Sequence, residues 1–426
     1  MSVSSITPGA ARCLVWLLLV LTSPSGLADT IPTITIRIAS DLSEASLEVP
    51  TESLPLVAGD GDLQRRIMPV ANAEVVRDTI AAQAPGEPVR LRIRLPAKHS
   101  DTVILADWQE WLPVPRHWSG GRPVMLDVHT PSGITVALPF KLVEHSPGRL
   151  RYLATPGLDN HRGFSAIGNV ALEQFDIGDM VITAALISGK RDAYIDWIET
   201  VARAALESHG NAPRRHALIA VVPIDARRST VPWAHVRRGG GTHIIAYVNE
   251  DASRDALVSD WTLFHEMAHL YHPYLRGRDR WLSEGFASYF QYFYQARAGT
   301  LDAQRAVDRL WAGFDRGRRE NLRYGKVHVT EGGRMRTYWT GAALALELDH
   351  RIRRAGEETL ATLMGRLAVR ALPASQPWTA RAYIEALDAL LDQPLLAPIY
   401  QEVVHSREFP RPTVDHRGAL ELLTGD

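Results

Sequence analysis

The stretch Trp261-Thr-Leu-Phe-His265-Glu266-Met-Ala-His269-Leu-Tyr-His272 is the most informative part of this 426-residue sequence. On a helix, residues four positions apart lie one turn above each other, so His265 and His269 can present two imidazole nitrogens to one ion. Glu266 stands where its carboxylate can reach a water on that ion without binding the ion itself. This H-E-x-x-H pattern predicts a catalytic zinc site. The alternative is an amphipathic helix whose histidines are buried and hydrogen-bonded.

A second segment, Trp281-Leu-Ser-Glu284-Gly-Phe-Ala-Ser-Tyr-Phe290, offers a third ligand. Glu284 follows His269 by 15 positions (284 − 269 = 15), and this gap lets the chain turn through Gly277 and return as a second helix. Two histidines and one glutamate are the thermolysin-type ligand set. Alternatively, Glu284 is a solvated charge near a helix N-terminus, where the helix dipole favours it. Its bulky apolar neighbours favour an inward carboxylate, which needs a partner.

These residues resemble the gluzincin metallopeptidases, and specifically the M1 and M61 aminopeptidase families. Both families carry W-L-x-E-G-F around the third ligand and a Y-x-x-G segment that opens the next helix. Tyr338-Trp-Thr-Gly341 matches the second segment, and the following Ala345-Leu-Glu-Leu-Asp-His-Arg-Ile-Arg353 is most similar to the M61 version. The resemblance covers residues 165–405 approximately.

The resemblance implies a single zinc ion held by His265, His269 and Glu284. Glu266 would take the proton of the attacking water and pass it to the leaving amine. Tyr338 would donate its phenol hydrogen to the tetrahedral oxyanion, although its sequence context alone would not distinguish it from a core tyrosine. The implied activity is zinc-dependent hydrolysis of a peptide or protein substrate through a metal-activated water.

The sequence departs from the family pattern in two places. The gap between His269 and Glu284 is shorter than the M1 spacing by about one helical turn. In both families an edge strand ahead of the zinc helix also carries a glutamate that binds the substrate's free amine. The corresponding stretch here is Gly239-Gly-Gly-Thr242-His243, with threonine in place of that glutamate, and Glu250 is too far along the chain to replace it.

Three functional hypotheses follow from this pattern. Aminopeptidase-like action is the family default. The missing glutamate favours endopeptidase action on short peptides instead. A non-catalytic, zinc-containing envelope protein that binds its partner without hydrolysis is the hypothesis from another functional class.

Three regions follow an N-terminal leader. Residues 29–165 alternate apolar and polar positions, which predicts an antiparallel β-rich domain. Residues 166–300 mix strand and helix patterns and predict a thermolysin-like α/β catalytic domain, while apolar stripes in 301–426 predict a helical C-terminal region carrying Tyr338. The fold class is therefore multidomain α+β. The predicted strands include 31–39, 89–95, 124–129, 181–188, 216–223 and 242–248, and the predicted helices include 192–209 and 253–272.

The first 28 residues have the pattern of a signal peptide. Arg12 supplies a positive charge, residues 13–22 a short apolar core, and Gly26 and Ala28 the small residues that a signal peptidase reads. Cleavage after Ala28 would place the mature protein in the periplasm or outside the cell, without a stable membrane span, because the apolar run is short. An uncleaved anchor is the alternative. Cleavage would remove Cys13, the only cysteine, so the mature chain could form no disulfide.

Composition and the remaining candidate residues add less. The formal net charge of -1 gives no electrostatic reason to expect a nucleic-acid partner. His272 shares the helical face of the motif histidines, but neighbouring Pro273 favours a role at the helix end. His243 either lines the substrate strand or caps a sheet edge. The aromatic residues of 289–294 predict packing surface: Tyr289, Phe290, Tyr292, Phe293 and Tyr294.

Overall fold

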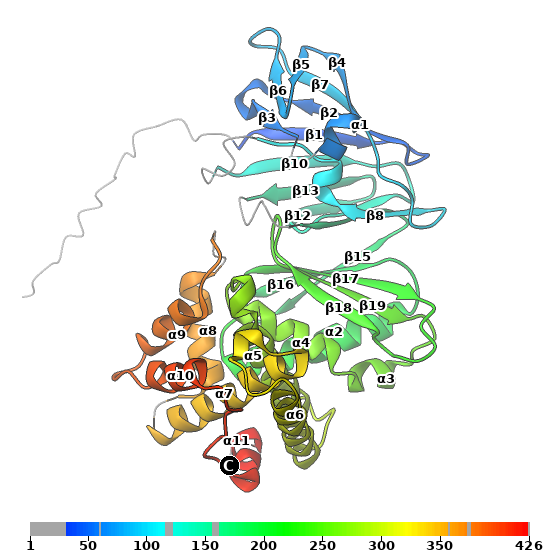
Figure 1. The fold of residues 1–426 in the computed structure, drawn as a ribbon. Coiled ribbons are helices and arrows are strands. Elements are labelled where there is room, and N and C mark those ends of the chain that lie inside the picture. The colour runs from blue at the N-terminus through cyan, green and yellow to red at the C-terminus, as the bar shows by residue number, and fades with distance from the viewer. Residues whose placement is uncertain are drawn as a thin grey trace, which may run out of the picture. The chain divides into compact units, whose positions relative to one another are not determined.

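The structure is a computed structural model that describes residues 31–58, 61–115, 122–155, 162–356, 358–372 and 376–424. The predicted signal peptide, residues 1–28, lies outside the described residues and remains a prediction. None of the helices in the described ranges combines the length and apolar character needed to cross a membrane. Residues Pro32–Asp426 belong to one unit, which is described below (Figure 1).

The N-terminal part of this unit consists of three sheets. Their strands alternate buried and more exposed residues. In β1 (Thr33–Ile38), for example, Ile34, Ile36 and Ile38 are buried. The seven-stranded sheet has the order β12 (Lys141–Ser146), β13 (Arg149–Ala154), β10 (Val124–His129), β1, β2 (Glu44–Val49), β7 (Val89–Arg94) and β4 (Ile67–Ala71). The smaller sheets are β11 (Thr135–Ala137), β14 (Phe164–Gly168) and β8 (Val103–Asp107), and β5 (Ala73–Val76), β6 (Thr79–Ala82), β3 (Leu56–Val57) and β9 (Val114–Pro115). A short helix, α1 (Gly61–Arg66), precedes β4.

The predicted antiparallel pairing holds for this region with one exception. Strands β1 and β10 pair in parallel, with Ile36 opposite Val128. Because these strands are far apart in sequence, no hairpin fixes their relative direction, and sequence patterning could not reveal it.

The second part is a mixed five-stranded sheet whose two faces pack into two different hydrophobic cores. Its order is β15 (Ala171–Ile177), β16 (Met180–Leu186), β17 (His216–Ile224), β19 (His243–Asn249) and β18 (Trp233–Arg237). Strands β16, β17 and β19 are parallel, and the outer two are antiparallel to them. Ala217, Ile219 and Val221 of β17 pack into the core beneath the helices, whereas the alternating Leu218, Ala220 and Val222 pack with the N-terminal sheets. This two-sided burial explains the continuous apolar run of β17.

The predicted helix 253–272 is wrong in one respect, because the chain breaks there into shorter pieces. Ser253 caps α3 (Arg254–Ser259) as expected, accepting a hydrogen bond from the N–H of Ala256. At Asp260 the backbone becomes extended, and its carboxylate accepts a 2.8 Å hydrogen bond from the N–H of Thr262. A new helix, α4 (Thr262–Ala268), then begins and ends in a 3₁₀ turn at His269–Tyr271.

The remaining chain is helical. Helices α2 (Arg191–His209), α4 and α5 (Arg280–Arg297) lie on one side of the β15–β19 sheet (Figure 1). They are followed by α6 (Ala303–Arg323), α7 (Arg334–Arg354), α8 (Leu360–Ala371), α9 (Ala380–Asp388), α10 (Leu396–His405) and α11 (His416–Thr424). The multidomain α+β fold class is therefore confirmed, with a β-rich N-terminal region and a helical C-terminal region. The exact domain boundaries remain predictions; β14 pairs with β8, so the strands of the first region extend to Gly168.

Candidate active site

His265, His269 and Glu284 come together as the sequence predicts. One potential ligand atom from each lies within 4.8 Å of the other two, and all three residues are buried. Glu284 Oε2 lies 3.3 Å from His265 Nε2 and 3.8 Å from His269 Nε2. The short spacing between the two motifs is accommodated by a 3₁₀ turn at Gly277–Asp279, which leads directly into α5.

The other ring nitrogen of His265 is fixed by Gln291. His265 Nδ1 lies 2.9 Å from Gln291 Oε1, an amide oxygen that can only accept a hydrogen bond. Nδ1 therefore donates to Gln291, and Nε2, which lies 3.3 Å from Glu284 Oε2, is the nitrogen that could bind a metal. Such a partner orients a metal-binding imidazole and selects its tautomer.

His269 is fixed in the same way by His272. His272 Nδ1 donates to the carbonyl oxygen of Pro273 at 2.8 Å, and burial lowers the pKa of His272 to about 3, so its Nε2 is an acceptor. His269 Nδ1 donates to that acceptor over 3.0 Å, which leaves His269 Nε2 as the free lone pair. Ser283 Oγ lies 3.2 Å from the same Nδ1. His272 thus supports a candidate ligand in addition to ending the helix.

Glu284 is oriented by Arg280, one turn earlier on α5. Arg280 Nε donates to Glu284 Oε1 at 2.9 Å, leaving Oε2 to face the two histidines. Burial alone would raise the pKa of Glu284, but hydrogen bonds and charges from His265, His269 and Arg280 outweigh it and lower that pKa. The carboxylate is therefore held as an anion.

Glu266 lies beside this cluster and is not one of its three ligand candidates. It is buried, and burial raises its pKa to about 7, although the His265 charge and a hydrogen bond from the backbone of Val236 act in the opposite direction. The pKa values of these two carboxyl groups therefore differ widely. Glu266 can accept a proton near neutral pH, whereas Glu284 stays ionised. Separation of this kind suits a general base next to a ligand.

Tyr338 reaches the cluster from α7. Its ring lies nearly parallel to that of His265, with 6.0 Å between the ring centroids. Burial, together with the charge of Glu284, raises the pKa of Tyr338 to about 12, so the hydroxyl keeps its proton. The structure thereby brings together all five predicted site residues, His265, Glu266, His269, Glu284 and Tyr338.

The predicted substrate strand at 239–243 is wrong. Residues 239–242 form the turn between β18 and β19, and His243 begins β19, where its Nε2 accepts a hydrogen bond from the N–H of Phe164. The edge strand beside Glu266 is β18, Trp233–Arg237. This strand carries no carboxylate. The glutamate that binds the substrate amine in the M1 and M61 families is therefore missing from β18 as well.

No protein-family model matches the sequence, and neither does any curated protein sequence. Several solved structures match the fold. An aminopeptidase N family protein from Idiomarina loihiensis is 14% identical, with 89% of this chain and 76% of that chain covered and a TM-score of 0.60. An M1 zinc metallopeptidase from Deinococcus radiodurans is 13% identical, with 90% and 94% covered and a TM-score of 0.50. Yeast LTA4 hydrolase is 10% identical, with 91% and 69% covered and a TM-score of 0.50.

These matches show that the chain has the fold of M1 zinc metallopeptidases, as the gluzincin resemblance implied. The finer likeness to M61 remains a prediction.

The sequence interpretation missed the residues that hold the candidate ligands in place. Arg280 and Gln291 lie four positions before and seven positions after Glu284, so helical periodicity places all three on one face of α5. That spacing was a usable signal. Arg238 was also missed; its Nη2 donates to the carbonyl oxygen of His269 at 2.9 Å, and only the tertiary structure reveals this contact.

Proposed function

We propose that this chain is a zinc-dependent metallopeptidase. The observation that carries the proposal is the state of the three ligand candidates. Each of His265, His269 and Glu284 has one polar atom held by the protein and another directed at a common point. Such an arrangement is what a metal site requires, since oriented ligands bind with little reorganisation.

The donor set fits zinc. Two imidazole nitrogens and one carboxylate oxygen are a known catalytic zinc set, which leaves a fourth position for water or substrate. When bound, the ion would supply Lewis acidity, polarising the substrate carbonyl and acidifying a water molecule. A bound cation would also balance the negative charge of the buried Glu284 carboxylate, which lies beside His265 and His269.

The remaining chemistry belongs to side chains of this chain. Glu266, with a pKa of about 7, is poised to accept the proton of the attacking water and return it to the leaving amine. Tyr338 retains its hydroxyl proton and can donate a hydrogen bond to the developing oxyanion. The substrate is a peptide: a variant of the Deinococcus radiodurans metallopeptidase was solved with a bound Tyr-Ser-Ala substrate.

The similar solved structures support aminopeptidase-like action as the first candidate, but the residues of β18 favour endopeptidase action as the second. An aminopeptidase must bind a free cationic amine beside the scissile bond. At this position β18 ends in Arg237, and Arg238 follows it, so the end of this strand presents cations rather than a carboxylate to an incoming amine. Arg237 forms an ion pair with Asp107, whereas Arg238 forms no ion pair within the described residues, although the charges of Glu266 and Glu284 favour its charged form.

The signal-peptide pattern supports action in the periplasm or outside the cell. Cell fractionation with N-terminal sequencing of the recovered protein tests this location, and a start at residue 29 is the expected result. Recovery of the intact N-terminus in the cytoplasm would refute it.

Hydrolysis of a mixed peptide library, followed by mass spectrometry, tests the function. Purified protein loaded with zinc is compared with the Glu266→Gln variant and with protein treated with a chelator. Loss of single N-terminal residues supports aminopeptidase action, and internal cuts support endopeptidase action. Stoichiometric zinc without any cleavage would instead support the non-catalytic binding protein, and protein that takes up no zinc would contradict all these hypotheses.

A further inference from the structure

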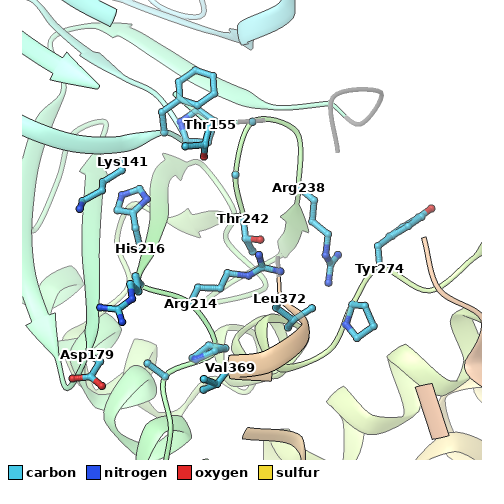
Figure 2. A pocket seen from close by; sticks show the side chains of 18 of the residues that line it. Lys141, Thr155, Asp179, Arg214, His216, Arg238, Thr242, Tyr274, Val369 and Leu372 are labelled. Atoms are coloured by element: carbon cyan, nitrogen blue, oxygen red, sulfur yellow. The ribbon is translucent and has the colours of Figure 1, made fainter. Parts of the chain in front are cut away.

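A cavity of about 510 Å³ is lined in part by Arg238, the residue that donates a hydrogen bond to the carbonyl oxygen of His269 (Figure 2). Its lining includes Arg214, Arg238, Lys141 and Thr242, and none of the five candidate active-site residues lines it. Figure 2 shows the side chains of Arg214 and Arg238 extending into the same part of this space. We call it the arginine cavity.

Both guanidinium groups are incompletely hydrogen-bonded within the described part of the chain. The Nε atoms of Arg214 and Arg238 are buried and make no hydrogen bond. Within the described ranges of the chain, neither side chain forms an ion pair with a carboxylate. Burial and the charge of Arg238 lower the pKa of Arg214, whereas the more distant charges of Glu266 and Glu284 favour the charged form of Arg238. The exposed Asp179 also lines the cavity, but on the opposite side from Arg238 (Figure 2).

Burying two neighbouring cations is costly unless an anion lies near both, and no carboxylate of the described residues acts on the charge of Arg214. A carboxylate suits this position best, because a guanidinium presents a planar set of N–H donors that matches its two oxygens. Burial lowers the pKa of Arg214 to about 9, which still leaves it charged at neutral pH.

The arginine cavity adjoins the site where a peptide would be cut. Arg238 bonds through Nη2 to the carbonyl oxygen of His269, and it directly follows β18, the edge strand beside Glu266. In the described structure, β18 pairs only with β19 and therefore has a free edge. A peptide that added to this edge in extended form would continue toward Arg238 and the cavity.

We propose that the arginine cavity binds a carboxylate of the peptide substrate, either an acidic side chain or the terminal group. This specificity rests on the proposed peptidase function. Such a cavity would make the chain selective for anionic peptides. The amine-binding glutamate of the M1 and M61 families, which this chain lacks, would instead select for a free amine.

Equilibrium binding tests the proposal without relying on turnover. The full chain carrying Glu266→Gln is titrated with fluorescent peptides in which one glutamate is moved through a neutral sequence, each paired with the glutamine analogue. At one position the glutamate peptide is expected to bind about tenfold or more tightly than its glutamine partner, the scale of one charged hydrogen-bonded pair. Amidation of the C-terminus in a parallel set shows whether the terminal carboxylate supplies the anion instead.

Matched variants assign the preference to the cavity. Arg214→Gln is expected to reduce the preference to about twofold or less, while Arg214→Lys retains part of it because the charge remains. Arg319→Gln, which removes an exposed arginine from α6, is expected to leave the preference unchanged. Circular dichroism of each variant establishes that it is folded, and the lysine variant serves as the test if Arg214→Gln does not fold.

Two results would overturn the proposal: equal binding of all glutamate, glutamine and amidated peptides, or a carboxylate preference that survives in Arg214→Gln. Neither result depends on hydrolysis. Failure of the peptidase proposal would appear separately, as zinc-loaded protein that binds anionic peptides but does not cut them.

Discussion

Gly285 on α5 and Gly341 on α7 pack directly against each other where the two helices meet. A Cβ atom added at 341 would lie 2.7 Å from the Cα of Gly285, and one added at 285 would lie 2.7 Å from the backbone nitrogen of Ala342. Glu284 immediately precedes one of these glycines, and Tyr338 lies about one turn before the other. The contact between the glycines therefore sets how closely Tyr338 approaches Glu284.

Substitution of Gly341 by alanine should disturb both stability and the site. The new methyl group has no space, so the helices must separate, at a cost of about 1–3 kcal/mol in the free energy of unfolding. Urea denaturation measures this loss. Gly277→Ala is the control, because a Cβ there meets no atom within 4 Å. Equal stability of the two variants would show that the helices do not make this contact in solution.

Gln291 should matter for metal affinity although it is not a ligand. Gln291→Leu keeps a similar volume but leaves the buried Nδ1–H of His265 without its acceptor. Loss of such a supporting contact typically weakens metal binding by about 10- to 100-fold. Competition with a chromophoric zinc chelator measures the affinity, and Gln304→Leu on the exposed face of α6 provides the control. Unchanged affinity in Gln291→Leu would mean that His265 keeps its orientation without this glutamine.

Much of the candidate site could be predicted from sequence because helical geometry relates residues at fixed spacing. His265 and His269 share a face wherever that segment is helical, and the break at Asp260 lies before both. The sequence could predict that Glu284 is a ligand but not how it reaches the two histidines, because that depends on the turn at Gly277–Asp279. Tyr338 required the family resemblance, because its position follows from the α5–α7 contact.

The edge strand and the arginine cavity could not be predicted in this way. Strand β18 is only five residues long, and its sequence WAHVR shows little hydrophobic alternation, with Trp233 exposed. Its position depends on pairing with β19 across a glycine turn. Arg214 and Arg238 come from separate loops, so their proximity depends entirely on tertiary structure.

Acid stability should depend on Asp127 in the N-terminal sheet. Arg149 binds both of its oxygens, at 2.8 and 2.9 Å, and this hydrogen bonding lowers the pKa of Asp127 below its ordinary value of 3.8 despite partial burial. Since the folded-state pKa is depressed, the stabilisation is complete above pH 3.8 and is lost as the pH falls through the folded-state value. Asp127→Asn should therefore be less stable than wild type at pH 7, and the difference should shrink below pH 4.

Urea denaturation at pH 7, 5 and 3 measures that difference. Asp101→Asn, at an exposed turn, is expected to show no such trend. A stability loss in Asp127→Asn that stays constant over this pH range would mean that the ion pair is not its cause.

Tyr338→Phe separates transition-state stabilisation from binding. The substitution removes only the hydroxyl, while the ring next to His265 remains. If that hydroxyl donates to the oxyanion, kcat should fall by about 100- to 1,000-fold with little change in KM. Zinc content and unfolding free energy should match wild type, because Tyr338 is not among the three ligand candidates and is only partly buried. Tyr324→Phe, at an exposed tyrosine, controls for the loss of a phenol elsewhere. A kcat within about threefold of wild type would exclude Tyr338 as the oxyanion donor, because the loss of one such donor costs far more than that.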